Sequence, residues 1–190
     1  MAITSQAAEG LMRRRWTIAE IEAVAAAGII DDDERFELIG GELVPMSTKG
    51  IRHEIIKAGL GFHFAKSLPN DLRFAVATTF RLTEDTFLEP DLVFFQRSDG
   101  IPNLGARTAL LVLEVADSSL EWDLGRKARI YADFGIPELW VIDARSRVTH
   151  VHRQPRLEGY SDVRQYAENQ RIVSAHISSV AFTLSELEAI

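Results

Sequence analysis

The sequence predicts an α/β fold, in which helices pack on a β-sheet, with a helix and a β-hairpin at the N-terminal end. Residues 109–116 are so continuously apolar that they predict a central strand covered on both faces. An amphipathic helix over residues 122–134 and a strand over residues 138–143 follow, and this helix crosses over from the first strand to the next. A chain of 190 residues with 46% hydrophobic and 26% charged residues favours a single core.

The first elements are predicted from local signals. Thr17 and Glu20 have the spacing of a capping box, which predicts a helix over residues 17–28. Residues 36–44 form two strands joined by a Gly-Gly turn, because glycine tolerates the positive φ angles of a two-residue hairpin. A second helix is expected over residues 51–67, before a Pro-Asn pair.

The remaining elements are expected on both sides of the central strand. Further strands are predicted near residues 72–82, 87–95, 147–153 and 160–166. A capped terminal helix is expected to start at Thr183 or Ser185. No repeat or linker divides the sequence, so we expect a flexible tail over residues 1–15 and one domain over residues 16–190.

Several classes of protein are excluded by composition. The apolar runs are far shorter than the roughly 20 residues of a membrane-spanning helix. The first ten residues lack the apolar stretch of a signal peptide. The absence of cysteine removes disulfides, thiolate nucleophiles and Cys-ligated metals, and fits a reducing compartment. We therefore expect a cytoplasmic protein that does not cross a membrane.

The net charge of −7 weighs against a nucleic-acid partner, because such proteins usually carry a basic surface. The charge is unevenly distributed. Residues 31–42 hold six acids and one arginine, whereas residues 143–171 hold six arginines and four acids. Two interpretations stay open: acidic segments that hold a divalent cation beside a basic region, or two ordinary solvated faces.

Three residues stand out as candidates for chemistry. Glu114 lies in the strand expected to be buried, where an ionised carboxylate is costly unless it is paired or binds a metal. Lys127, thirteen residues later, falls on the apolar side of the next helix, so it has a buried partner or reaches along the core to water. Asp91 follows Pro90 where a loop enters an apolar strand. A Pro-Asp pair in this place is typical of a turn, but its aspartate can also be a metal ligand.

The histidines carry less weight. His53 shares a helical face with apolar residues, which suits a core histidine and one at the rim of a site equally well. His150 and His152 alternate along a strand, where they form a solvated edge or bind a metal. We leave all three outside the catalytic set.

Together, these segments resemble the PD-(D/E)XK nuclease superfamily, and specifically its Uma-two family of candidate restriction endonucleases, formerly a domain of unknown function. The resemblance covers nearly the whole chain beyond the tail. Its motifs, in order, are residues 35–43 with Glu37, His53, residues 89–93 with Asp91, Leu113-Glu114-Val115 with Ser118-Ser119, Asp123-Leu124 with Lys127 and Tyr131, and residues 135–143.

The resemblance implies a restriction-endonuclease-like fold, a mixed central β-sheet flanked by helices, with a metal held by Asp91 and Glu114. The third place of the Glu-X-Lys triplet is Ala116 instead of lysine, and Lys127 on the next helix is the replacement that we propose. Mg²⁺ prefers oxygen ligands, so the carbonyl of Ala116 is a third candidate ligand, and Mn²⁺ is the expected substitute for Mg²⁺. Glu37 resembles an acid that completes a second metal position or orients Lys127; an exposed hairpin acid is the alternative.

The expected function is that of a hydrolase: a Mg²⁺-dependent endonuclease that cleaves phosphodiester bonds in DNA by activating water. Cleavage of both strands would suit a homodimer. Two alternatives stay open. One is an inactive interaction module that keeps the nuclease fold and pairs Glu114 with Lys127 as a salt bridge, and the other is a nuclease that acts on RNA.

Overall fold

A computed structural model describes residues 13–31 and 33–187 of the chain. Most of the predicted tail, residues 1–12, lies outside the described residues. The contacts group the chain into two compact units, a smaller one (Met1–Met46 with Thr83–Leu88) and a larger one (Ser47–Leu82 with Glu89–Ile190). The prediction of one domain over residues 16–190 stays a prediction.

The smaller unit is a helix with a short antiparallel sheet, built from α1 (Ile18–Ala26), β1 (Phe36–Ile39), β2 (Glu42–Pro45) and β5 (Thr86–Leu88). The capping box at the start of α1 is present, as predicted: the Thr17 side chain accepts from the Glu20 amide. Gly40 and Gly41 both have positive φ in the β1–β2 turn, which confirms the Gly-Gly hairpin. The buried side chains of Ile18, Ile21 and Leu38 form its core.

The larger unit is built on a mixed six-stranded sheet of order β10-β9-β8-β7-β6-β3. Its strands are β3 (Leu72–Val76), β6 (Leu92–Gln96), β7 (Ala109–Ala116), β8 (Glu138–Asp143), β9 (Val148–Arg156) and β10 (Gly159–Tyr166). The β7–β8 pair is parallel and the other pairs are antiparallel. The prediction of β7 as a central, doubly covered strand is confirmed, since β6 and β8 flank it and all but one of its residues are buried.

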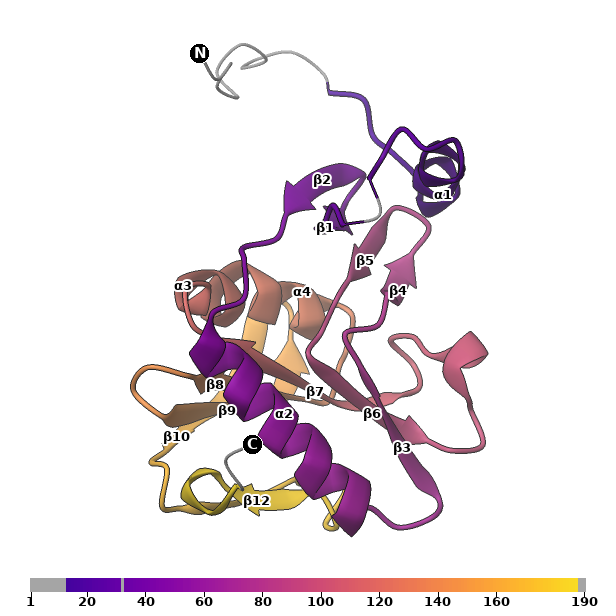
Figure 1. Ribbon diagram of the computed structural model, residues 1–190. Helices are drawn as coiled ribbons and strands as arrows, with labels where there is room; N and C mark the ends of the chain where they lie inside the picture. Colours follow the sequence, from indigo (N-terminus) through magenta and orange to yellow (C-terminus); the bar gives the residue numbers. More distant parts are fainter. Residues whose placement is uncertain (1–12, 32, 188–190) are drawn as a thin grey trace. The chain divides into compact units, whose positions relative to one another are not determined.

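Helices and the C-terminal segment cover this sheet. Helix α2 (Ile51–Ser67) lies along one face, where its side chains join a core with the odd-numbered residues Leu111, Leu113 and Val115 of β7 (Figure 1). Because side chains alternate along a strand, Glu114 points to the opposite face. That face carries the helical segment that follows β7, whose Lys127 and Tyr131 contact Glu114.

Two predicted strands are each divided in the structure. The segment predicted at residues 72–82 splits into β3 and β4 (Phe80–Thr83), because Ala77 adopts a positive φ that interrupts an extended chain. The segment predicted at residues 87–95 splits into β5 and β6 around Pro90, whose ring removes a ladder donor. The second break coincides with a boundary between the two units, which falls between Leu88 and Glu89.

Two helix predictions also need correction. The helix predicted at residues 122–134 consists of α3 (Leu120–Trp122), a π-helical turn η3 (Asp123–Lys127) and α4 (Ala128–Asp133). The predicted terminal helix is wrong for the described residues: β12 (Ala181–Thr183) pairs with β11 (Arg171–Val173), and a single 3₁₀ turn η4 (Leu184–Glu186) follows. The three residues of β12 are all buried, so sheet pairing and burial outweigh the local capping signal.

The structure also contains a 3₁₀ turn, η2 (Ile101–Asn103), in the loop between β6 and β7. Within residues 13–31 and 33–187, no helix has both the length and the apolar character needed to cross a bilayer.

Candidate active site

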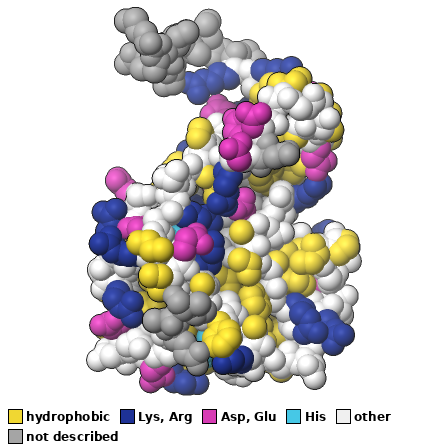
Figure 2. Space-filling model, viewed as in Figure 1, with side chains coloured by type: hydrophobic (Ala, Val, Ile, Leu, Met, Phe, Trp, Pro, Cys, Tyr) yellow, Lys and Arg dark blue, Asp and Glu magenta, His cyan; other side chains and the backbone are white. Residues whose placement is uncertain are grey.

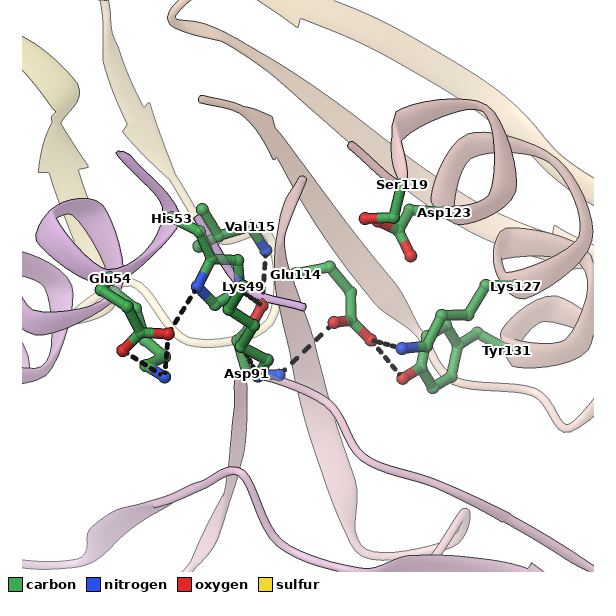
Figure 3. Close-up of polar contacts among 11 residues, drawn as sticks. Lys49, His53, Glu54, Asp91, Glu114, Val115, Ser119, Asp123, Lys127 and Tyr131 are labelled. Atoms are coloured by element: carbon green, nitrogen blue, oxygen red, sulfur yellow. Dashed lines mark hydrogen bonds and ion pairs between the residues drawn. The ribbon is translucent and has the colours of Figure 1, made fainter. Parts of the chain in front are cut away.

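Asp91 lies immediately before β6, and three groups from three segments contact its carboxylate (Figure 3). Oδ1 lies 2.8 Å from the Lys49 ammonium. Oδ2 accepts a hydrogen bond of 2.8 Å from the backbone N–H of Val115 in β7, and lies 3.0 Å from Nε2 of His53 in α2. The side chain is only 3% exposed, so these contacts take the place of water.

The surroundings of Asp91 keep it ionised. Burial alone raises the pKa of this carboxyl, but the hydrogen bond and charge of His53 and the charge of Lys49 act in the opposite direction and outweigh it. The pKa of Asp91 therefore lies well below its usual value. A buried carboxylate that stays charged near neutral pH is a suitable ligand for a hard cation.

Glu114 points from β7 toward the helical segment that follows the strand. Its Oε1 accepts a 2.6 Å hydrogen bond from the Tyr131 hydroxyl and lies 2.9 Å from the Lys127 ammonium. Lys127 and Tyr131 are four residues apart in the helix, so they share one face. The Glu114 and Lys127 side chains are each only 5% exposed, which makes this a buried ion pair.

The two acids are neighbours. Oε2 of Glu114 lies 3.4 Å from the backbone nitrogen of Asp91, and Asp91 in turn accepts from Val115, the residue after Glu114. The β6–β7 pairing brings these residues together, because Leu92 and Leu113 are register partners. The structure thus brings together Asp91, Glu114 and Lys127, three of the four predicted catalytic residues.

The lysine lies at the end of the π-helical turn η3, a feature often found at functional sites. In this turn the Ala128 amide donates to the Asp123 carbonyl, five residues back. Asp123 is buried and accepts a 2.6 Å hydrogen bond from the Ser119 hydroxyl. Asp123 lies four residues before Lys127 in the same helical segment, a spacing visible in the sequence, and is a buried acid that the sequence prediction left outside the site residues.

The predicted roles of two further residues, Glu37 and Ala116, stay predictions. Glu37 is buried on β1 in the smaller unit, so it is not the exposed hairpin acid of the alternative interpretation. The Ala116 carbonyl, the third candidate metal ligand, accepts a 2.8 Å hydrogen bond from the Ala144 amide. A carbonyl oxygen has a second lone pair, so this bond leaves the oxygen able to bind a cation.

Sequence reasoning missed Lys49 and left His53 outside the catalytic set. Lys49 lies in a segment before α2 with no periodic pattern, so nothing local pointed to it. The other ring nitrogen of His53 lies 3.0 Å from Glu54, which pairs with Lys57 at 2.9 Å. A chain of polar contacts therefore extends from Asp91 along α2.

The donor set suits magnesium. Among residues 13–31 and 33–187, no group of three or more His, Asp or Glu side chains is arranged to hold a metal ion. Mg²⁺ does not need one, since it usually keeps several waters and takes one or two carboxylates. Asp91 and Glu114 are both buried, and Oε2 of Glu114 lies 3.4 Å from the backbone nitrogen of Asp91, so these two acids can supply that share.

The sheet order, the two acids and the helical lysine place this protein in the class of restriction-endonuclease-like folds. A solved structure, a putative nuclease belonging to DUF820 from Anabaena variabilis ATCC 29413, is similar to it with a TM-score of 0.66 and 14% identity, over 90% of this chain and 97% of the other. The model of the Uma2 family, described as "Putative restriction endonuclease", matches residues 19–185. The chain belongs to the Uma2 (Uma-two) family. No curated protein matches it.

Proposed function

We propose that this protein is a Mg²⁺-dependent endonuclease that hydrolyses phosphodiester bonds in DNA, with Mn²⁺ as a substitute metal. Its family supports a nuclease. The observation that carries the finer proposal is the pair of buried, adjacent acids, Asp91 and Glu114, with an ammonium 2.9 Å from the second. Oxygen ligands and a lysine are the groups that metal-assisted phosphodiester hydrolysis requires.

Each residue has a defined task in this reaction. Mg²⁺, when bound, would supply positive charge that polarises the phosphate and acidifies water. Asp91 and Glu114 would hold the cation, His53 and the Val115 amide fix the orientation of Asp91, and Tyr131 fixes that of Glu114. The Lys127 ammonium orients the attacking water and offsets the negative charge that develops on the phosphate oxygens. The water oxygen bonds to phosphorus as the bond to the leaving sugar oxygen breaks; the attacking water loses one proton to solvent, and the leaving oxygen takes one from solvent.

One observation favours a second candidate function, an inactive interaction module. The Glu114–Lys127 ion pair is the contact that such a module would keep for structure alone. On the face drawn in Figure 2, lysine and arginine side chains are interspersed with acidic ones. The nuclease proposal therefore depends on Asp91, because a purely structural Glu114–Lys127 pair does not need a second buried acid beside it.

A cleavage assay tests the proposal. The purified protein is incubated with double-stranded DNA, single-stranded DNA or RNA, with Mg²⁺, Mn²⁺ or a chelator. We expect cleavage of DNA with either cation, no cleavage with the chelator, and loss of cleavage in Asp91→Asn, which keeps the shape and removes the charge. Asp162→Asn is the matched control, because it makes the same change at an acid of β10 whose partner is Arg164.

The same assay separates the alternatives. Cleavage of RNA alone would support the RNA nuclease. A wild-type protein that cleaves no substrate with either cation would contradict the nuclease proposal and support the interaction module. Sizing chromatography with and without DNA tests the homodimer, which we propose because one two-fold dimer can cut both strands.

A further inference from the structure

Lys49 is a second lysine in the site, and it contacts the acid that Lys127 does not. Its ammonium lies 2.8 Å from Oδ1 of Asp91, and its side chain is 13% exposed. The other oxygen of Asp91, Oδ2, is fixed by the Val115 amide at 2.8 Å and by His53 at 3.0 Å. Oδ1 is therefore the oxygen that Asp91 can offer to a cation, and Lys49 already occupies it.

Glu114 shows the same division between its two oxygens. Oε1 takes both Lys127 and Tyr131, whereas Oε2 lies on the side of Asp91, 3.4 Å from the Asp91 amide nitrogen. A divalent cation that contacts both acids would approach Oδ1 of Asp91 and Oε2 of Glu114. Lys127 contacts Oε1 of Glu114, which such a cation would not use. Lys49 contacts Oδ1 of Asp91, which the cation would use.

The two lysines also differ in how firmly they are held. Lys127 comes from the helical segment and is 5% exposed. Lys49 comes from the segment between β2 and α2, where the chain is neither helix nor strand, and its side chain is more exposed. A flexible four-carbon stem at the edge of a site can move its ammonium into water at small cost.

We infer that Lys49 is a displaceable counter-cation of Asp91, which holds Oδ1 in the absence of a divalent cation and leaves it when the cation binds. The inference rests on the proposed function, because it takes Asp91 and Glu114 as the cation ligands. An ammonium and a divalent cation repel each other strongly at one oxygen, so they exclude one another. Lys49 thereby lowers the affinity of the site and raises the cation concentration at which it fills.

The alternative is that Lys49 is a permanent structural partner of Asp91. Its removal would then leave Asp91 buried with less compensation and reduce stability, but it would not improve cation binding. A measurement of cation affinity distinguishes these roles, whereas a measurement of stability alone does not.

The test is Mn²⁺ binding by calorimetry to the full-length protein, for wild type, Lys49→Met and Asp91→Asn. We expect Lys49→Met to bind Mn²⁺ at least about tenfold more tightly than wild type, and Asp91→Asn to lose binding. The matched control is Lys57→Met, which removes one charge from a lysine of similar exposure, 17%, that pairs with Glu54 instead of Asp91. Its affinity should stay within about twofold of wild type, since Lys57 contacts neither proposed ligand.

A second measurement needs no variant. Acetylation of lysines in the wild-type protein, read by mass spectrometry, should become faster at Lys49 when Mn²⁺ is added and should not change at Lys57. This readout keeps the inference testable even where Lys49→Met does not fold.

The outcomes separate the inference from the function it rests on. Equal Mn²⁺ affinity of wild type and Lys49→Met, with binding lost in Asp91→Asn, would overturn the inference and leave the cation site intact. Unchanged Lys49 acetylation at saturating Mn²⁺ would do the same. If neither wild type nor Lys49→Met binds Mn²⁺, the cation site fails, and the inference fails with it.

Discussion

Replacing Lys127 with methionine tests the centre of the proposed site. Lys127→Met keeps a long, flexible side chain and removes the ammonium that lies 2.9 Å from Oε1 of Glu114. If this ammonium orients the attacking water, cleavage should fall by about 10²–10⁴, the range typical of a positioned proton-transfer or electrostatic group.

Stability should fall as well, because both side chains of the pair are buried. Breaking a buried ion pair by removing one partner commonly costs about 3–5 kcal/mol. The Tyr131 hydroxyl, 2.6 Å from the same oxygen, still donates in the variant, so we expect the lower end of this range. Mg²⁺ should recover part of the loss, since a ligand present at about 100 times its Kd stabilises the folded state by about 2.7 kcal/mol.

The assay combines cleavage rates with the free energy of unfolding from denaturant titration, each with and without Mg²⁺. Lys57→Met is the control for loss of a charge outside the proposed site. A Lys127→Met protein that cleaves at the wild-type rate would refute a role for this lysine in the reaction. A stability loss that Mg²⁺ leaves unchanged, in a protein whose wild type cleaves nothing, would show that the ion pair is purely structural.

Three further predictions concern the neighbouring groups. Tyr131→Phe removes the hydroxyl that donates to Glu114 and should cost about 1.5–3 kcal/mol of unfolding free energy, the usual value for a hydrogen bond to a charged group; thermal unfolding with no shift would contradict this. Burial, with the charge of His150, lowers the pKa of His152 to about 4 from an ordinary 6.5. As the pH falls, the unfolded chain therefore protonates His152 before the folded chain does. The contribution of His152 to the free energy of unfolding should be full above about pH 6.5 and fall by up to about 3 kcal/mol toward pH 4. The same loss of stability in acid titrations of His152→Gln and wild type would count against this prediction. Zinc should not be the native metal, because the proposed ligands are hard oxygens and the chain has no cysteine; calorimetry that shows tight zinc binding through His150 and His152 would overturn this.

Local patterns in the sequence determined the main elements. The extent of α2 at residues 51–67 and the Gly-Gly hairpin follow from helical periodicity and turn chemistry, and the structure confirms both. The apolar run of β7 placed it inside the sheet and marked Glu114 as an anomaly. These features depend on residues close together in the chain, so one sequence is enough to find them.

Local patterns failed where burial or pairing with a distant segment decided the conformation. Residues 181–183 carry a helix-capping signal nearby, yet they form β12, because pairing with β11 and burial of all three side chains determine their conformation. The break between β3 and β4 depends on the positive φ of Ala77, a residue whose side chain gives no sign of it.

The groups around Asp91 were decided only by the tertiary structure. Lys49 and His53 reach Asp91 across 42 and 38 residues of sequence, because packing α2 on the sheet brings the start of this helix beside the start of β6. The second oxygen of Asp91 is fixed by the backbone N–H of Val115, a contact that every residue except proline would allow at position 115 and that no sequence pattern can show. The sequence alone therefore determined which acids and which lysine to suspect. Which basic side chains each acid contacts depends on strand register and helix packing. These are set by contacts between distant parts of the chain.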